Sequence, residues 1–359
     1  MRVVHVTPGH AHTLRLSARE EPRCPAGSVK IRVLEAGLDG TDRDILEGAY
    51  GRPPRGADTL IIGHECLGII EEAGSDVRGF APGTLVVPTV RRPDNCPYCQ
   101  RNEYDHCTGD RIERGISGAD GFVQEYVIEA PEHLIRVPKR ARTYAILTEP
   151  MAIVEKAIER AYAANSTFTW TPERALITGD GTIGLLAAHA LTTRGLDVTI
   201  TGLGADERKA SILREAGITR YDAKRYPLSW IAHEHGRADL IIEATGSSAV
   251  ALEAMETIGA NGVVVLTSIT PRAARADIGL DELNNHLVTG NRTVIGSVNA
   301  SNEDFKRALA TLHELEEHHR ISKIITGRYA FEHVKDAIAA MPRHIKTVIT
   351  IASGADRAL

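Results

Sequence analysis

An imidazole and a carboxylate stand side by side in an otherwise apolar stretch, "LIIGHECLGII" at residues 60–70. The aliphatic neighbours indicate that His64 and Glu65 are buried, where polar and charged groups require partners. The two side chains could belong to a buried ion pair or a hydrogen-bonded loop, or they could bind a metal ion. Adjacent residues of a regular strand point to opposite faces. Both could therefore reach one ion only if the chain bends, and Gly63 permits a bend.

Two further carboxylates occupy positions that could contribute to such a site. Asp39 lies beside glycines in "EAGLDGTDRDI", at the end of a predicted strand, and Glu149 precedes a proline in "ILTEPMAI". One imidazole with up to three carboxylates is a donor set that suits zinc. A zinc site that keeps one exchangeable position is catalytic rather than structural. Spacing alone does not bring these four residues together.

Three of the five cysteines lie within twelve residues, in "CPYCQRNEYDHC". An odd number of cysteines is a poor disulfide framework for a chain of this length and favours metal binding in a reducing compartment. The spacing of Cys96, Cys99 and Cys107 is typical of a structural zinc lobe, for which Asp94 or Glu103 could supply the fourth ligand. The alternative is a loop of unpaired thiols that holds no metal.

The segment "GDGTIG" follows a predicted strand and opens an apolar helix, as a dinucleotide-binding turn does. Gly179 would allow the tight turn, Gly181 the approach of the pyrophosphate, and Gly184 the packing of helix on strand. The helix start, with Thr182 and Ile183, would face the phosphates. An ordinary glycine turn of an α/β fold is the alternative.

The sequence leaves the choice between NAD and NADP open. Sites that prefer NAD usually carry an acid at the end of the second strand, where it binds the ribose hydroxyls. Here that strand ends at Gly202, followed by Leu203 and Gly204, which offer neither an acid nor an arginine. Asp206 and Arg208 lie just beyond and favour opposite choices.

The elements that would position these residues change character along the chain. Up to about residue 147, short strands alternate with glycine and proline; beyond it, strands alternate with helices, which predicts a parallel sheet covered by helices. A length of 359 residues favours two domains. A net charge of -5 gives no reason to expect a nucleic acid or an anionic membrane as partner. With no apolar run of roughly 18 residues and no signal-like start, we expect a cytoplasmic protein.

Nearly the whole chain resembles the zinc-dependent medium-chain dehydrogenase/reductase superfamily, and is most similar to its archaeal-type glucose 1-dehydrogenases. The motifs that carry the resemblance occur in family order and include "GLDGTDRDI", "IIGHECLG", "VVPTVRRP", "DGFVQEY", "LTEPMAIVEKA", "GDGTIG" and "GSVNAS". The resemblance implies an α/β protein with a GroES-like β-barrel catalytic domain, residues 1–151 and 300–359. A Rossmann domain with a doubly wound parallel sheet, residues 152–299, would bind the dinucleotide.

The resemblance also implies an activity: zinc-dependent oxidation of an aldose, glucose at C1 above all, to its lactone, with hydride transfer to NAD or NADP. Asp39 stands where most members of the superfamily have a cysteine ligand. By position the zinc site would comprise Asp39, His64, Glu65 and Glu149, with Glu65 also counted as catalytic. Thr41 would lie beside the substrate oxygen, and Asp42 would orient the histidine. The residues expected to bind the sugar are Glu113, Glu149 and Asn299. Those expected to contact the cofactor are Gly202, Arg208 and Asn299.

Several departures from the family pattern keep alternatives open. Pro93 stands where a first lobe cysteine is expected, and Val90 and Thr289 stand where relatives can offer Asn and His. Another sugar or polyol, such as galactose, arabinose, xylose or a hexitol, is therefore the second reading, and a non-catalytic nucleotide-binding sensor the third. The resemblance implies a homodimer or homotetramer, with "GNRTVIGSVN" as a candidate edge strand for pairing Rossmann sheets.

Overall fold

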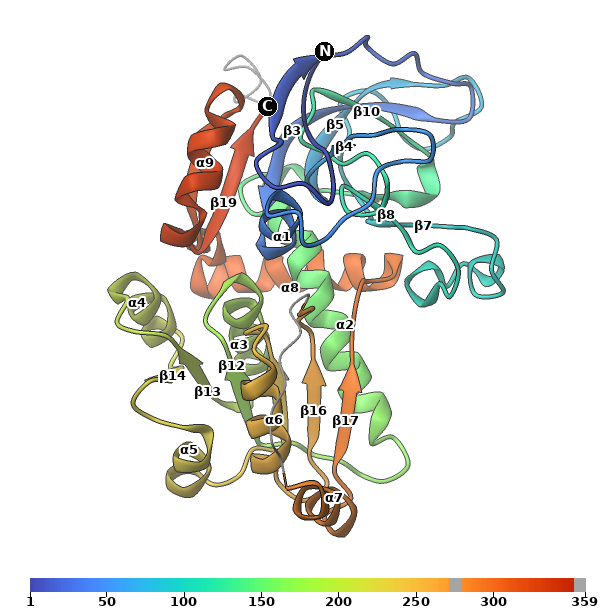
Figure 1. Ribbon diagram of the computed structural model, residues 1–359. Helices are drawn as coiled ribbons and strands as arrows, with labels where there is room; N and C mark the ends of the chain where they lie inside the picture. The colour runs from blue at the N-terminus through green and yellow to red at the C-terminus, as the bar shows by residue number, and fades with distance from the viewer. Residues whose placement is uncertain (271–278, 352–359) are drawn as a thin grey trace. The chain divides into compact units, whose positions relative to one another are not determined.

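The chain forms two compact units in the computed structural model, which describes residues 1–270 and 279–351 (Figure 1). Unit 1 comprises Met1–Ala152, Asn299–His313 and the chain from Ser322 onward. Unit 2 comprises Ile153–Val298 and Glu314–Ile321. Among the described residues, no helix combines the length and the apolar character that crossing a membrane requires.

A mostly antiparallel sheet of seven strands forms the centre of unit 1. Its strands run in the order β11-β6-β5-β3-β19-β18, and β10 also pairs with β3. Their bounds are β3 (Val29–Leu38), β5 (Glu65–Ala73), β6 (Leu85–Pro88), β10 (Tyr126–Glu129), β11 (Leu134–Arg136), β18 (Ile325–Ala330) and β19 (Lys346–Thr350). The last strand of the chain therefore lies beside an early one, because β19 pairs antiparallel with β3.

Strand β3 shows why these residues form the core of the barrel-like unit. Val29, Ile31 and Val33 are fully buried and alternate with half-buried residues, as the sequence pattern predicts. From Leu34 onward every residue of the strand is buried, because β5 and β19 pair with it on its two edges and other elements cover both faces. Apolar burial on this scale is what fixes the strand register.

Smaller elements complete unit 1. Two three-stranded sheets have the orders β2-β1-β4 and β7-β8-β9. Their strands are β1 (Arg2–Val6), β2 (Arg15–Ala18), β4 (Leu60–Ile61), β7 (Arg91–Arg92), β8 (Ile112–Arg114) and β9 (Gly118–Ala119). The helices with residues in this unit are α1 (Gly40–Leu46), the start of α2 (Thr148–Ala164), the first part of α8 (Asn302–His319) and α9 (Val334–Ala340).

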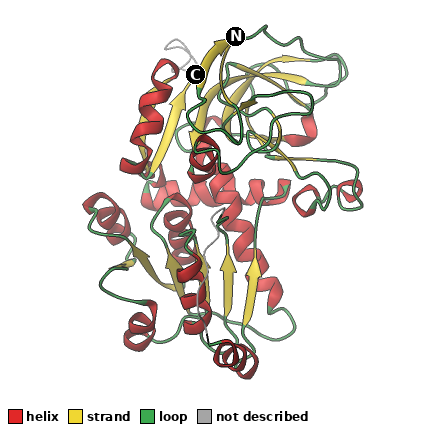
Figure 2. Ribbon diagram, viewed as in Figure 1, coloured by secondary structure: helices red, strands yellow, loops and turns green. Residues whose placement is uncertain are grey.

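Unit 2 contains a six-stranded parallel sheet in the order β14-β13-β12-β15-β16-β17, and the predicted parallel sheet with helices is confirmed (Figure 2). Its strands are β12 (Arg174–Thr178), β13 (Asp197–Gly202), β14 (Thr219–Asp222), β15 (Leu240–Glu243), β16 (Val263–Leu266) and β17 (Thr293–Gly296). Its connecting helices are α3 (Thr182–Thr193), α4 (Glu207–Glu215), α5 (Leu228–His235), α6 (Ser248–Thr257) and α7 (Leu280–Thr289). The strand order reverses between β12 and β15, which is where doubly wound sheets bind their ligands.

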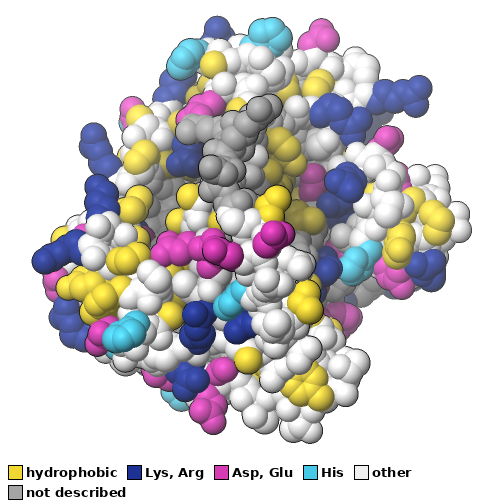
Figure 3. All heavy atoms as spheres, turned by 60° about the horizontal axis from the view of Figure 1, so that its bottom comes forward, with side chains coloured by type: hydrophobic (Ala, Val, Ile, Leu, Met, Phe, Trp, Pro, Cys, Tyr) yellow, Lys and Arg dark blue, Asp and Glu magenta, His cyan; other side chains and the backbone are white. Residues whose placement is uncertain are grey.

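Strands buried on both faces explain the apolar runs that the sequence shows in this half. Ile177, Ile241 and Val264 are fully buried, as expected for the middle of a parallel sheet with helices on both faces. On the face that Figure 3 shows, side chains of both charges are interspersed with small groups of hydrophobic side chains. This mixture agrees with the small net charge of -5.

The glycine-rich turn after β12 is held by close backbone contacts. Gly179 has a φ of +94°, in the left-handed region that favours glycine. A Cβ atom at Gly184 would overlap the carbonyl oxygen of Gly179, whereas a Cβ atom at Gly181 would meet no atom within 4 Å. The packing role predicted for Gly184 is therefore visible in the structure.

This contrast predicts different effects for two small substitutions. Gly184→Ala should destabilise the protein by about 1–3 kcal/mol, because the turn must shift to admit the methyl group. Gly181→Ala, at the N-cap of α3, should cost less than about 1 kcal/mol. Urea unfolding followed by circular dichroism would measure both, and equal unfolding midpoints for the two variants would contradict the packing argument.

Candidate active site

His64 lies in a bend between β4 and β5. The bend is made at Gly63, whose φ is +88°, as the sequence predicts. The carbonyl oxygen of Gly63 accepts a hydrogen bond from the Phe122 N–H at 2.8 Å, which fixes the loop. His64 and Glu65 are 4% and 1% exposed, so the predicted burial of the pair is confirmed.

Asp39 joins helix α1 to the imidazole of His64. As N-cap of the helix, its Oδ1 accepts hydrogen bonds from the N–H groups of Thr41 at 2.8 Å and Asp42 at 3.2 Å. Its Oδ2 lies 3.4 Å from His64 Nε2 and 3.4 Å from the hydroxyl of Thr41. One carboxylate oxygen thus serves the helix, and the other faces the candidate site.

Asp42 acts on His64 mainly through the backbone. Its side chain is fully buried, with Oδ1 accepting from the Gly63 N–H at 3.0 Å and Oδ2 from the Asp39 N–H at 3.1 Å. The distance from Oδ2 to His64 Nδ1 is 3.9 Å, longer than a hydrogen bond. Asp42 therefore ties the loop of His64 to helix α1.

Glu65 is paired with a lysine that the sequence does not single out. Its Oε1 accepts a hydrogen bond from Lys346 Nζ, which also donates to the carbonyl of Leu38 at 3.1 Å. Lys346 is 1% exposed and opens β19. The sequence feature that could have indicated this pair is a lysine at the start of the apolar segment "IKTVITIA". Such a buried cation requires a carboxylate.

The side chains of Asp39, His64 and Glu65 fit a divalent metal ion. One ligand atom from each lies within 4.8 Å of the others. Glu65 Oε2 and His64 Nδ1 are buried and have no hydrogen-bond partner in the described part of the chain. Three protein ligands with one position left over are the donor pattern of catalytic zinc. Glu149, in the first turn of α2, lies outside this compact group, but its charge reaches His64.

Electrostatics in this pocket are dominated by burial and by crowded carboxylates. Burial raises the pKa of Glu149 to about 8 and that of Asp42 to about 7, and neighbouring carboxylates add to both shifts. Burial by itself would lower the pKa of His64, yet Asp39, Asp42 and Glu149 raise it well above its ordinary value. The pocket therefore favours an additional positive charge, whether a proton or a metal ion.

A second polar cluster in unit 1 joins Glu113 and Asn299, two of the residues predicted to bind sugar. Asn299 Nδ2 donates a hydrogen bond to Glu113 Oε1, and Arg91 Nη2 lies 3.2 Å from the same oxygen. All three residues are buried, and Arg91 in β7 is the register partner of Glu113 in β8. A Cβ atom at Gly115 would overlap the backbone of Gly63, so this cluster lies close to the loop of His64.

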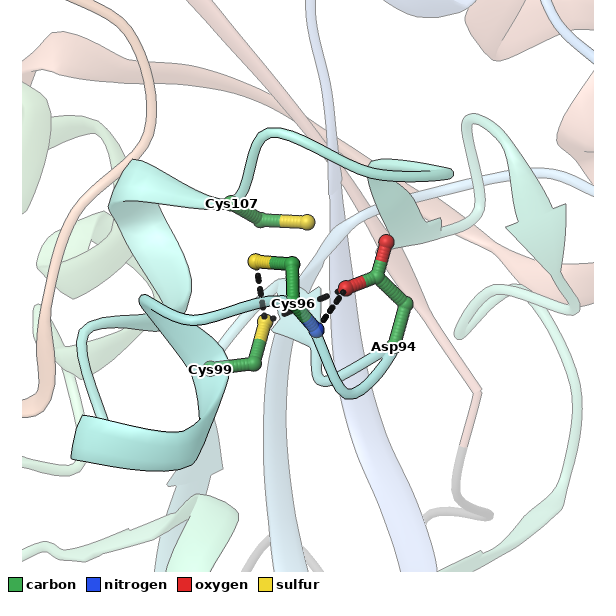
Figure 4. A group of neighbouring side chains, drawn as sticks. All are labelled: Asp94, Cys96, Cys99 and Cys107. Atoms are coloured by element: carbon green, nitrogen blue, oxygen red, sulfur yellow. Dashed lines mark hydrogen bonds between the residues drawn. The ribbon is translucent and has the colours of Figure 1, made fainter.

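The cysteine lobe brings together the three predicted thiols and one of the two candidate carboxylates (Figure 4). Ligand atoms of Cys96, Cys99, Cys107 and Asp94 all lie within 4.8 Å of one another. Asp94 Oδ1 lies 3.4 Å from Cys99 Sγ and accepts from the Cys96 N–H at 3.1 Å. Glu103 instead pairs with Arg101 at 3.0 Å on the surface. The geometry favours Asp94 as the fourth ligand.

Local hydrogen bonds prepare one of these thiols for metal binding. N–H groups of Cys99 and Thr108 lower the pKa of Cys96 to about 6, so its thiolate predominates at neutral pH. Burial raises the pKa of Cys99 to about 12. A zinc ion in the lobe would stabilise both thiolates, since the thiolate is the form that binds metal.

In unit 2 the predicted dinucleotide residues lie around the turn between β12 and α3. Gly181 is the N-cap of α3, and Thr182 and Ile183 are its first two residues. Since a Cβ atom at Gly181 would meet no atom within 4 Å, the turn leaves room for a phosphate group. Gly202 ends β13, and Arg208 lies in the first turn of α4, 3.4 Å from Asp206.

The lobe geometry predicts that Asp94→Ala lowers the zinc content of the purified protein by about one equivalent per chain, because a structural site needs four ligands. Glu103→Ala is the matched control and should leave the zinc content unchanged. Metal analysis of both variants after dialysis gives the measurement. A loss of zinc from the Glu103 variant alone would contradict this assignment.

The buried pair of Glu65 and Lys346 predicts a large effect on stability. Lys346→Met leaves the carboxylate of Glu65 without its partner and should destabilise the protein by about 3–5 kcal/mol. Chemical unfolding of the metal-free protein would measure this, with Lys346→Arg as the variant that keeps the charge. A Lys346→Met protein as stable as the parent would show that the pair contributes little.

Comparisons with known proteins agree with this geometry. A family model described as "Glucose dehydrogenase C-terminus" matches residues 142–351, and one described as "Alcohol dehydrogenase GroES-like domain" matches residues 25–139. The chain is 40% identical to a glucose 1-dehydrogenase of Methanocella arvoryzae over 357 residues, covering 98% of this chain and 99% of that protein. It is 36% identical to a glucose 1-dehydrogenase of Thermoproteus tenax over 356 residues, covering 98% and 99%.

A solved structure also matches almost completely. It is the Haloferax mediterranei glucose dehydrogenase in complex with NADP, Zn and gluconolactone, with a TM-score of 0.91 and 29% sequence identity. The match covers 98% of this chain and 100% of that one. The predicted GroES-like and Rossmann fold class is thereby confirmed. The sequence and the fold of this chain show that it belongs to the glucose dehydrogenase family of zinc-dependent medium-chain dehydrogenases.

Proposed function

We propose that the protein is a zinc-dependent, NAD(P)-dependent sugar dehydrogenase that oxidises glucose at C1 to its lactone. The observation that carries this proposal is the group of half-buried Asp39 with buried His64 and Glu65, beside a polar cluster centred on Glu113. Relatives that match over nearly their whole length are glucose 1-dehydrogenases, and the matched Haloferax structure holds NADP, Zn and gluconolactone. A sugar oxidation needs a metal site and several hydrogen-bonding groups together.

Asp39, His64 and Glu65 would hold the zinc ion, with Glu149 contributing charge to the same pocket. When bound, zinc supplies Lewis-acid polarisation of the substrate hydroxyl and the nicotinamide supplies the hydride acceptor. The hydroxyl of Thr41 donates a hydrogen bond to Asp39 Oδ2 at 3.4 Å and would accept one from the sugar hydroxyl, so it can relay a proton. As it takes up the sugar proton, its own proton must leave for a neighbouring carboxylate or for solvent. Burial raises the pKa of Glu149 in the metal-free pocket, and a divalent ion beside it would favour its charged form.

The remaining residues orient the substrate and the metal ligands. Glu113 and Asn299 offer an acceptor and a donor to the sugar hydroxyls, and Arg91 holds the carboxylate of Glu113. Burial raises the pKa of Glu65 and the charge of Lys346 opposes this rise, while the hydrogen bond from Lys346 fixes Oε1 and leaves Oε2 for the metal. Asp42 fixes the loop that presents the imidazole.

We also propose that unit 1 is the catalytic domain and unit 2 the dinucleotide-binding domain, close to the bounds predicted from the sequence. The protein would assemble as a homodimer or homotetramer. Strand β17 supports this, since it forms one edge of the six-stranded sheet, and an edge strand offers backbone groups for pairing with a second copy.

The test is steady-state oxidation of a panel of aldoses and polyols with NAD and with NADP, together with zinc analysis. Asp39→Ala and His64→Ala should lower kcat/KM for glucose by about two to three orders of magnitude, because Lewis-acid catalysis contributes several kcal/mol. His233→Ala, an exposed histidine on α5, is the control and should keep full activity.

Two results would overturn the proposal in different ways. Turnover of galactose, xylose or a hexitol far above that of glucose would replace the substrate and keep the mechanism. Full activity of the zinc-free parent protein, or of His64→Ala, would end the metal mechanism itself.

A further inference from the structure

The glycine-rich turn of unit 2 carries an acid, Asp180, between its first two glycines. The side chain is buried, although the turn lies at the carboxyl end of the sheet where a dinucleotide binds. A carboxylate at this point of the turn is not needed for the turn itself, since Gly179 and Gly184 make its close contacts. Its position suggests a role toward the ligand.

The carboxylate of Asp180 occupies the space above the end of strand β13. A Cβ atom added to Gly202, the last residue of that strand, would overlap Asp180 Oδ2. In Rossmann folds this strand end usually carries the acid that binds the ribose hydroxyls of NAD. Here the strand ends in glycine, and the carboxylate of the preceding turn fills the same place.

Two cations fix the orientation of this carboxylate. Lys209 Nζ lies 2.8 Å from Oδ1, and Arg220 reaches Oδ2 with Nε at 2.9 Å and Nη2 at 2.6 Å. Arg220 Nη2 also donates to the carbonyl of Gly204 at 2.9 Å, which anchors the guanidinium on the loop after β13. A carboxylate offers about four acceptor positions, so these three donors leave about one for a ligand.

We propose that Asp180 replaces the missing strand-end acid: it accepts a hydrogen bond from the adenosine ribose of the cofactor and disfavours a 2′-phosphate, which shifts cofactor choice toward NAD. The inference rests on the dinucleotide-binding part of the proposed function. The residues fit a dinucleotide because Gly181 leaves open space at the start of α3.

The opposite reading, in which the two cations bind a 2′-phosphate, is disfavoured by the local charge balance. Three cationic side chains around the end of β13 are each paired with a carboxylate: Lys209 and Arg220 with Asp180, and Arg208 with Asp206. A third carboxylate, Asp222, accepts from the Gly204 N–H at 3.1 Å. Lys224 lies near Asp222 and helps to lower its pKa, so four cations face three carboxylates around the strand end. The surplus of one positive charge is too small to neutralise a dianionic phosphate.

The experiment measures binding to the full-length chain rather than turnover. Isothermal titration with 5′-AMP and 2′,5′-ADP isolates the effect of the 2′-phosphate, and titrations with NAD and NADP repeat it on whole cofactors. Asp180→Asn keeps the shape and removes the charge, so the affinity ratio of 2′,5′-ADP to 5′-AMP should rise about tenfold. Arg220→Gln should lower that ratio, because the charge of Asp180 is then less compensated.

Asp239→Asn is the matched control, since Asp239 is also hydrogen-bonded, to the N–H groups of Glu173 and Arg174, at the opposite end of the strands. Its ratio should stay unchanged. An unchanged or lower ratio in Asp180→Asn, with 5′-AMP still bound, would overturn the inference alone. Failure of the parent protein to bind either dinucleotide would overturn the proposed function and this inference with it.

Discussion

The arrangement of unit 1 depends on a concentration of carboxylates that is largely shielded from water. Asp42, Glu65 and Glu149 are buried and Asp39 is half-buried around one imidazole, and this crowding would be prohibitive without a cation among them. Lys346 compensates one carboxylate permanently. The remaining charge would attract a divalent ion, and binding of such an ion would stabilise this unit.

The supporting elements can be understood as ways to build that pocket. A bend at Gly63 turns His64 away from the strand direction, and helix α1 places Asp39 by using it as a cap. Asp42 connects the two by binding the backbone of the loop. The polar cluster of Glu113 and Asn299 lies near because Gly115 packs directly against Gly63. Small residues thus determine which polar groups become neighbours.

The sheet of unit 2, the bend before His64 and the cysteine lobe could be predicted from the sequence, because each depends on residues that are close together along the chain. The parallel sheet follows from strands alternating with helices, the bend from Gly63, and the cysteine lobe from close spacing along the chain. Lys346 and Arg91 could not, because their partners Glu65 and Glu113 are distant in sequence and only the strand pairing brings them together. The role of Asp180 could not be predicted either, because it depends on the space that Gly202, which has no side chain, leaves for the carboxylate.

The pairing of β19 with β3 has a consequence for synthesis of the chain. Strand β19 completes the central sheet of unit 1 and supplies the counter-charge of Glu65, and it is made after all the other described strands. Unit 2 is formed almost entirely by one continuous segment of the chain, so it can fold before unit 1 is complete. Until release, the nascent N-terminal half exposes an unpaired strand edge and uncompensated carboxylates. Folding of unit 1 can therefore be completed only after β19 has been synthesised.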